Sequence, residues 1–328
     1  MQKILITGGA GFIGAHLAHA LKKKNKIMIV DNLENKGGIP FVDKSNIFIK
    51  GDILDHKVLK KIENWKPDII YHLAAQSGGE GAYDNPKKDF NSNGYGTYLI
   101  ALLAKNINCK YFIYSSSVAV YGSNNSKITE NSKINPDSIY GISKYAGEMF
   151  VKQILKNTDV KVRIFRIFNT FGPGENLNNL KKGMVSIYSS YLWKKKPLII
   201  KGSLKRYRNL TYIKDCINIL SESIKNKKLK QFEIFNLSNG LKVTVERLIK
   251  EILKVNGKKK WKIINKENTP GDSFGTDADV SYLKKQFKNY KFLKLEEGLK
   301  RYFLWIEKIK KRSLINSHPY KINKDYKL

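Results

Sequence analysis

Cysteine is nearly absent from the chain, which has only Cys109 and Cys216 among 328 residues. Two isolated cysteines exclude a disulfide framework and a cysteine-based zinc site, and we expect no bound metal. Long apolar runs are also missing, since no stretch approaches the ~20 apolar residues that a membrane span requires. Residues 1–3 lead directly into an apolar segment, so we expect no signal peptide. A reduced, cytoplasmic setting is therefore expected.

Acidic residues and arginine are scarce as well. Lysine and arginine together number 61 against 28 acidic residues, the formal net charge is +33, and only seven of the basic residues are arginine. A nucleic-acid-binding protein usually gathers its basic residues on one face, whereas these lysines are spread along the chain among many Asn and Ile. All three residue types have A/T-rich codons, so genome composition explains the excess as well as function does. We expect no specific nucleic-acid partner.

Apolar residues make up 41% of the sequence, which is enough for a full hydrophobic core. Short β-branched and aromatic segments alternate with helical ones, and this predicts an α/β fold with a Rossmann-type, doubly wound parallel sheet. The expected strands are 3–7, 26–30, 46–49, 68–72, 110–116, 161–168 and 232–237. The expected helices are 12–24, 56–64, 86–106 and 137–156.

The rest of the chain predicts a smaller, discontinuous substrate-binding domain. The Rossmann-type domain is expected over residues 1–170 and 210–238, and the second domain over 171–209 and 239–311. From residue 312 the chain becomes polar and basic, which predicts a loose tail over 312–328.

A glycine-rich turn follows the first strand, where residues 7–14 read Thr-Gly-Gly-Ala-Gly-Phe-Ile-Gly. Gly8, Gly11 and Gly14 have the spacing of a dinucleotide turn, widened by one residue between the first two. Such a turn lets a pyrophosphate approach the N-terminus of the first helix, where unpaired N–H groups and the helix dipole attract it. A purely structural tight turn is the alternative.

Asp31 ends the second strand, where a carboxylate can accept hydrogen bonds from the adenosine ribose. The same charge would repel a 2′-phosphate, so Asp31 favours NAD over NADP. A simple strand-end cap is the plainer role for this residue.

Tyr140 and Lys144 lie four residues apart on a predicted helix and therefore share one of its faces. A free tyrosine has a pKa of ~10, too high for a base at neutral pH. A nearby lysine cation favours the phenolate and can also hold the nicotinamide ribose. Upstream, three serines at 115–117 end a buried strand, at the edge of a parallel sheet where ligands bind. This position suits a hydroxyl that donates to a substrate oxygen.

These motifs together resemble the extended short-chain dehydrogenase/reductases, and among them the nucleotide-sugar epimerases typified by UDP-glucose 4-epimerase. The resemblance covers residues 1–301 and has many pieces in the same order. The pieces are TGGAGFIG (7–14), Asp31-Asn32, GDILD (51–55), HLAAQ (72–76), Asn93 before Gly96-Thr97, SSSVAVYG (115–122), YGISK (140–144), RIFNTFGPG (166–174) and RYRNLTYIKD (206–215).

The resemblance implies a role for each matching residue. Tyr140 would be the acid/base at the sugar hydroxyl, and Lys144 would tune it. Ser117, or its neighbour Ser116, would hydrogen-bond the same oxygen. The residues implied to line NAD are Gly8, Gly11, Phe12, Ile13, Gly14, Asp31, Asn32, Asp52, Ile53, Leu73, Ala74, Ala75, Asn93, Tyr140 and Lys144. Those implied to contact the substrate diphosphate are Asn169, Arg206 and Arg208, since arginine can bind a diphosphate through two hydrogen bonds.

The resemblance also implies a homodimer, in which the helices over 86–106 and 137–156 pack as a four-helix interface. Ile142, Tyr145, Met149 and Ile154 are the apolar residues expected there, although some of them could face the sheet.

Two departures from the family pattern concern the substrate pocket. Thr269 stands where the family often has an arginine, just before Pro-Gly-Asp at 270–272, although Arg206 could compensate. Residues 78–81, Gly-Gly-Glu-Gly, are richer in glycine than the family pattern and indicate an unusual sugar pocket.

The expected function is an NAD-dependent epimerase of polysaccharide biosynthesis that acts on a nucleotide-activated sugar, by oxidation to a keto sugar at carbon 4 and return of the hydride. A net nucleotide-sugar dehydrogenase or reductase is one alternative. A 4,6-dehydratase is disfavoured, because that group carries Asp-Glu where this chain has Val118-Ala119. A catalytically inactive NAD-sensing or scaffold protein has no need of Tyr140, Lys144 and Ser117 together.

Overall fold

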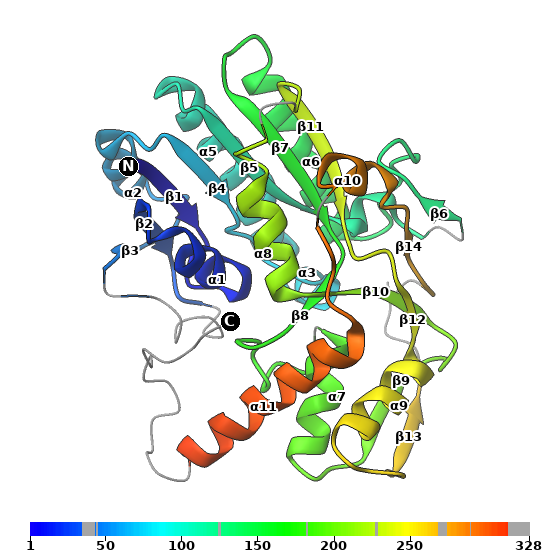
Figure 1. The fold of residues 1–328 in the computed structure, drawn as a ribbon. Coiled ribbons are helices and arrows are strands. Elements are labelled where there is room, and N and C mark those ends of the chain that lie inside the picture. Colours follow the sequence, from blue (N-terminus) through cyan, green and yellow to red (C-terminus); the bar gives the residue numbers. More distant parts are fainter. Residues whose placement is uncertain are drawn as a thin grey trace.

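A seven-stranded parallel sheet lies at the centre of the molecule (Figure 1). The computed structural model describes residues 1–34, 43, 45–123, 126–181, 183–226, 229–267, 274–288 and 290–313. The strands of the sheet are β1 (Gln2–Thr7), β2 (Asn25–Asp31), β3 (Ile47–Lys50), β4 (Ile69–His72), β5 (Tyr111–Ser117), β7 (Lys161–Ile167) and β11 (Phe232–Leu237). Their order is β11-β7-β5-β4-β1-β2-β3, which reverses beside β1 as in a Rossmann-type fold. The predicted fold class is confirmed, and each predicted strand agrees to within one residue at either end.

Helices cover both faces of this sheet, because its strands are buried on both sides. On one face α1 (Phe12–Leu21) packs against α8 (Ile213–Glu222). The other face carries α2 (His56–Trp65), α5 (Gly96–Asn106) and α6 (Ile139–Leu155). The helix predicted over 86–106 begins as α4 (Pro86–Phe90) and passes through a π-helical turn, η2 (Asn91–Tyr95), into α5. The first helix ends at Leu21, before the three lysines that the prediction included.

Smaller elements continue beyond the sheet, and the sequence did not predict most of them. Three short strands, β8 (Asn169–Phe171), β10 (Tyr207–Tyr212) and β12 (Lys242–Thr244), form a second sheet. The other strand pairs are β9 (Leu198–Lys201) with β13 (Ile263–Lys266), and β6 (Lys127–Ile128) with β14 (Asp277–Ala278). The remaining helices are α3 (Gly79–Asp84), η3 (Val118–Tyr121), α7 (Met184–Trp193), α9 (Val245–Val255), α10 (Ser281–Gln286) and α11 (Leu295–Ser313). Figure 1 shows α7, α9, β9, β13 and α11 grouped together below the parallel sheet.

Buried apolar side chains connect this lower region to the sheet. One cluster extends from Ile4 and Leu17 in the parallel-sheet half to Leu198 and Val243 in the lower region. The predicted division into two domains stays a proposal. Its boundary at 209/210 lies within β10. The last helix, α11, continues through Ser313 into the segment predicted as a tail, and residues 314–328 lie outside the described part.

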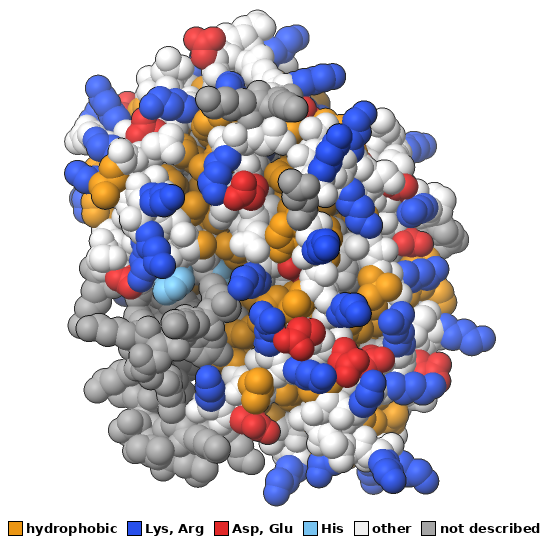
Figure 2. All heavy atoms as spheres, viewed as in Figure 1, with side chains coloured by type: hydrophobic (Ala, Val, Ile, Leu, Met, Phe, Trp, Pro, Cys, Tyr) orange, Lys and Arg blue, Asp and Glu red, His pale blue; other side chains and the backbone are white. Residues whose placement is uncertain are grey.

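Basic side chains are scattered over the surface. On the face drawn in Figure 2, lysine and arginine are interspersed with acidic and apolar groups and do not form one continuous patch. This distribution agrees with the interpretation of the lysine excess as compositional. Within the described ranges, no helix is long and apolar enough to cross a bilayer.

Candidate functional site

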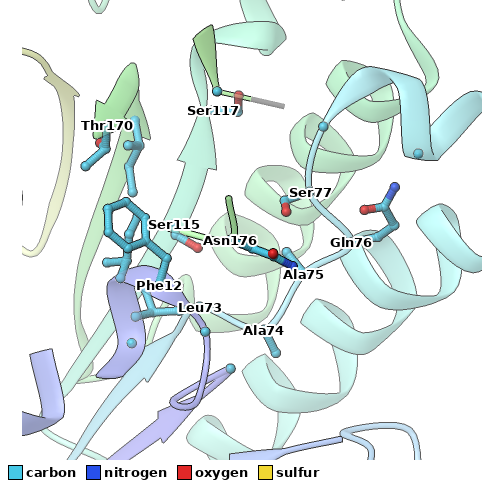
Figure 3. Close-up of a pocket in the computed structure, with 18 of the residues that line it drawn as sticks. Phe12, Leu73, Ala74, Ala75, Gln76, Ser77, Ser115, Ser117, Thr170 and Asn176 are labelled. Carbon is cyan, nitrogen blue, oxygen red and sulfur yellow. The ribbon is translucent and has the colours of Figure 1, made fainter. Parts of the chain in front are cut away.

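A cavity of about 920 Å³ lies at the carboxyl ends of the sheet strands, and residues from 174 to 186 line its far side. Figure 3 shows residues 73–77 along one wall, Phe12 at the start of α1, Ser117 at the end of β5, and Asn176, which lies between β8 and α7 in the chain. The predicted site residues that line it are Gly8, Gly11, Phe12, Ile13, Gly14, Asp31, Asn32, Asp52, Ile53, Leu73, Ala74, Ala75, Ser116, Ser117, Tyr140, Lys144 and Asn169. Gly78 and Gly81 of the glycine-rich segment also line it, at the start of α3.

In the turn between β1 and α1, neighbouring backbone atoms approach so closely that glycine is required at two positions. Gly8 has a φ of +67°, and a Cβ on it would lie 2.7 Å from the backbone nitrogen of Ala74. A Cβ on Gly14 would lie 2.3 Å from the carbonyl oxygen of Gly8. The N-cap of α1 is Gly11, which contributes no side-chain hydrogen bond to the helix end. The first N–H groups of α1 therefore face a cradle that fits a pyrophosphate.

Asp31 holds its carboxylate at the edge of the cavity, and backbone groups orient it. Its Oδ2 accepts a hydrogen bond from the Ala10 N–H at 3.0 Å, and its Oδ1 accepts one from the Leu33 N–H at 2.8 Å. Burial raises the pKa of this carboxyl, while the backbone hydrogen bonds act to lower it. A carboxylate has about four acceptor sites, so capacity remains for a ribose hydroxyl beside these backbone donors. Nearby, Asn32 Nδ2 donates to Asp52 Oδ2 at 2.9 Å, which holds these two predicted residues together.

Tyr140 and Lys144 lie in the first turns of α6. Ser138 caps this helix by accepting a hydrogen bond from the Gly141 N–H at 3.1 Å, so the helix begins immediately before Tyr140. Burial raises the pKa of Tyr140 to about 12, against a hydrogen bond from Ser117 that lowers it. Burial also lowers the pKa of Lys144 to about 7. Its Nζ lies 4.6 Å from the centre of the Tyr114 ring, within the range of a cation–π contact.

The two candidate serines have different partners. Ser116 Oγ donates to Glu148 Oε1 at 2.5 Å. Ser117 Oγ accepts a hydrogen bond from the Ala119 N–H at 3.2 Å, and it lies close enough to Tyr140 to act on the pKa of that phenol, which it lowers. The sequence left the choice between the two open, and the structure brings Ser117 to the tyrosine.

Asn93 lines no part of the described cavity. It lies fully buried on η2, where its Nδ2 is 3.0 Å from the Gln76 carbonyl oxygen and 3.1 Å from both Asp89 Oδ1 and Ser143 Oγ. Its implied contact with NAD stays a prediction, and its observed contacts connect the helices on either side of it.

Arg206 and Arg208 also lie away from the cavity lining, and both are buried on or beside β10. Arg208 Nη1 donates to the carbonyl oxygens of Tyr207 at 2.8 Å and Phe274 at 3.3 Å. Arg206 Nη2 donates to the Lys201 carbonyl oxygen. The role of these arginines at a diphosphate stays a prediction, and Thr269 with residues 270–272 lies outside the described residues.

A run of asparagines that the sequence analysis did not single out lines the cavity instead. Asn176 Oδ1 accepts from the backbone N–H of Asn178 at 3.0 Å, and Asn179 Oδ1 accepts from that of Lys181 at 2.9 Å. Asn178 Oδ1 accepts from Lys194 Nζ at 3.1 Å. Because each partner can only donate, each amide oxygen is identified without ambiguity, and the Nδ2 groups are the remaining donors. Asparagine is so common in this chain that the run carried no signal by itself.

The comparisons with known proteins agree with this geometry. The model of the NAD dependent epimerase/dehydratase family matches residues 4–238. A putative UDP-glucose 4-epimerase of Methanocaldococcus jannaschii is 30% identical over 310 residues, which cover 93% of this chain and 98% of that protein. A dTDP-D-glucose 4,6-dehydratase of Dictyostelium discoideum is 32% identical over 276 residues, which cover 78% of this chain but only 62% of that protein.

Solved structures extend the similarity to the whole fold. The UDP-glucose 4-epimerase of Thermotoga maritima, solved with UDP-glucose, is 27% identical with a TM-score of 0.86 over 93% of this chain and 99% of that one. The UDP-glucuronic acid 4-epimerase of Bacillus cereus, solved with UDP-glucuronic acid and NAD, is also 27% identical with a TM-score of 0.86, over 94% of this chain and 99% of that one.

Proposed function

The chain belongs to the NAD-dependent epimerase/dehydratase family, and we propose that it inverts carbon 4 of the sugar in a nucleotide-activated sugar. The observation that carries this proposal is that Tyr140, Ser117 and the buried Lys144 line one cavity, which also contains the glycine turn. The two solved 4-epimerases, which share the fold over nearly their whole length, support carbon 4 as the position.

NAD is the cofactor, and the residues present fit it. The cradle formed by Gly8 and Gly14 admits a pyrophosphate where any side chain would collide with backbone. Asp31 can accept hydrogen bonds from the adenosine ribose and disfavours a 2′-phosphate. When bound, NAD supplies the acceptor and later the donor of the hydride that carbon 4 loses and regains.

The protein's own part in the reaction is the movement of one proton. We assign Tyr140 to take the proton of the 4-hydroxyl as the carbon becomes a ketone, and to return it after the sugar has presented its other face. We assign the ammonium of Lys144 to stabilise the phenolate during the reaction, against burial, which raises the pKa of Tyr140. Ser117 holds the sugar oxygen through its hydroxyl. The proton and the hydride both return to the sugar, so no net oxidation occurs.

Elimination of water does not suit this site. Val118 and Ala119 follow Ser117 in η3, and neither side chain has a proton to give or take. A net dehydrogenase remains the second candidate, because the same three residues could serve an oxidation without return.

The asparagine run supports a diphosphate in the substrate. A diphosphate only accepts hydrogen bonds, and the Nδ2 groups of Asn176, Asn178 and Asn179 only donate. Lys181 lines the same wall and adds a positive charge, although in this structure it pairs with Asp84 at 2.5 Å. We infer that this wall, together with Asn169, holds the diphosphate. Arg206 and Arg208 would first have to leave their carbonyl partners.

A homodimer is the assembly that the exposed apolar residues favour. Ile142 and Met149 of α6 are both about half exposed, at 55% and 46%, and Phe90 and Tyr95 are exposed on the neighbouring helical segments. Tyr145 and Ile154, which the sequence placed in the same group, pack partly against the interior. Large apolar side chains on adjacent helices mark an interaction site. The cytoplasmic location stays a prediction from the sequence.

The test of the function is incubation of the purified protein with UDP-, GDP- and CDP-sugars without added nicotinamide. Epimerisation gives a second sugar nucleotide of unchanged mass, separable by chromatography. A product lighter by two hydrogens, with NADH accumulating, would identify a dehydrogenase and contradict the proposal. A product that has lost water would identify a dehydratase. The Tyr140→Phe variant serves as the inactive control in each incubation.

A further inference from the structure

Asp89 is a buried carboxylate to which the reaction described above gives no role. It lies on α4, where the other four residues are exposed and Asp89 itself is 0% exposed. Its Oδ1 accepts a hydrogen bond from Asn93 Nδ2 at 3.1 Å, and its Oδ2 accepts one from Ser143 Oγ. Neither partner is charged, and no ion pair of Asp89 occurs among the residues that the structure describes. A buried charge without a charged partner is costly, and such groups concentrate at functional sites.

The hydrogen bonds of Asp89 bring it to the catalytic turn of α6. Ser143 precedes Lys144, and its Oγ lies 3.0 Å from the Tyr140 carbonyl oxygen. Asp89 is therefore joined through one hydroxyl to the turn that carries both Tyr140 and Lys144. Burial raises the pKa of Asp89 and lowers that of Lys144, and in each case the opposite charge of the other residue acts against this effect.

We propose that Asp89 is the buried counter-charge of Lys144, a positioning residue that keeps the ammonium protonated beside Tyr140. The inference rests on the proposed function for its meaning in catalysis. Its basis is the full burial of Asp89 and its hydrogen bonds to Ser143 and Asn93.

The other titratable groups that face Lys144 serve this purpose less or not at all. Glu148, on the same helix, also stabilises the ammonium of Lys144, but less than Asp89 does, and it is held in an ion pair by Arg166 at 2.8 Å. Tyr114 of β5 presents its ring, and burial keeps its phenol protonated by raising its pKa. Burial lowers the pKa of His72 on β4 to about 3, so that side chain is neutral. Tyr140 is the group that Lys144 is expected to serve.

The test is the Asp89→Asn variant, because asparagine can keep both hydrogen bonds. Its Oδ1 can accept from Asn93, and its Nδ2 can donate to Ser143 Oγ, since a hydroxyl also accepts. Loss of the negative charge makes the ammonium of Lys144 less stable and the phenolate of Tyr140 more stable, so both pKa values fall. We expect both limbs of the pH–rate profile to move to lower pH by about one unit. At a fixed pH on the alkaline limb, the rate then falls about tenfold.

Two further variants distinguish the effect of the Asp89 charge from the effect of its hydrogen bond to Ser143. Ser143→Ala removes a hydrogen bond but keeps the charge, and we expect lower activity with an unmoved pH profile. Glu63→Gln removes an exposed carboxylate that pairs with Lys60, and we expect neither change. If Asp89→Asn lowers the rate equally at every pH, as Ser143→Ala should, Asp89 is a structural tether and the proposal is overturned.

A measurement without turnover keeps this inference separate from the proposed function. The pKa of Lys144 is titrated by NMR on the NAD-loaded protein with ¹⁵N-labelled lysine, and the spectrum of a Lys144→Met protein identifies its signal. Asp89→Asn should lower the pKa of Lys144. If the wild type epimerises no sugar nucleotide but this shift occurs, the proposed function fails and the role of Asp89 stands. If the shift is absent, the role of Asp89 is wrong whatever the activity.

Discussion

Ser116 Oγ donates a 2.5 Å hydrogen bond to Oε1 of Glu148 in the buried layer directly behind the candidate active site. The same carboxylate is held by Arg166 through Nε at 2.9 Å and Nη2 at 2.8 Å. Ser116 is therefore part of a buried ion-pair network between β5, α6 and β7. Its neighbour Ser117 lines the cavity with Tyr140 and acts to lower the pKa of that phenol.

This division predicts different consequences for the two alanine variants. Ser117→Ala should lower kcat about 10- to 100-fold, the range of a lost hydrogen bond to a group that becomes charged. Ser116→Ala should have a smaller effect on kcat but lower the free energy of unfolding by about 1–3 kcal/mol, because Glu148 loses a buried donor. Steady-state kinetics and urea denaturation of both variants distinguish the two roles. A larger loss of activity in Ser116→Ala would reverse the assignment.

Tyr140→Phe should fold normally, retain NAD and lose turnover by about 10²–10⁴-fold, the usual contribution of a general acid/base. The control is Tyr145→Phe, which removes a hydroxyl from the same helix outside the cavity lining. Both are compared by kcat and by the amount of NAD released on denaturation. Near-wild-type turnover without the Tyr140 hydroxyl would contradict the mechanism.

Asp31→Ala should weaken NAD binding and narrow the preference for NAD over NADP, because the ribose loses its acceptor and the 2′-phosphate loses a repelling charge. Asp31→Asn should show both effects, since its amide nitrogen cannot accept the backbone hydrogen bond that one carboxylate oxygen now accepts. Binding titrations with both dinucleotides measure the change. If the wild type binds NADP more tightly than NAD, the ribose assignment is wrong.

Asn176→Asp and Asn179→Asp should raise the KM for the sugar nucleotide by roughly tenfold or more, as each replaces a donor by a negative charge facing a diphosphate. Each aspartate keeps the oxygen that accepts the backbone hydrogen bond, so the turn is preserved. NAD affinity, measured on the same proteins, is the internal control and should not change. An unchanged KM in both variants would exclude this wall as the diphosphate site.

The wild-type protein should be a dimer by light scattering at micromolar concentration, and Ile142→Glu combined with Met149→Glu should be a monomer. The free energy needed to bury two carboxylates in an apolar interface exceeds the free energy that association of the two apolar surfaces provides. Leu304→Glu, at an exposed apolar position on α11 outside this surface, is the matched control and should remain dimeric. A monomeric wild-type protein would contradict the proposed homodimer.

The sequence by itself determined the parallel sheet, the glycine turn and the pairing of Tyr140 with Lys144. These features depend on local patterns. A strand buried on both faces is a short apolar run wherever it occurs, and residues four apart on a helix must share a face. The close backbone contacts at Gly8 and Gly14 are also visible in the sequence, as glycines at fixed positions, because no other residue fits there.

The tertiary structure alone decided how the rest of the site is assembled. β8 pairs with β10, about forty residues later in the chain, and such pairing has no local signature. Whether Ser116 or Ser117 faces the tyrosine depended on Glu148 and Arg166, which lie on other elements. Arg208 donates to carbonyl oxygens, one of which belongs to a residue far away in the sequence. Asn176 lines the cavity from a loop, and Asp89 contacts α6 from the short helix α4. Each of these outcomes is a competition among hydrogen-bonding partners that are far apart in sequence, and only folding brings those partners within reach.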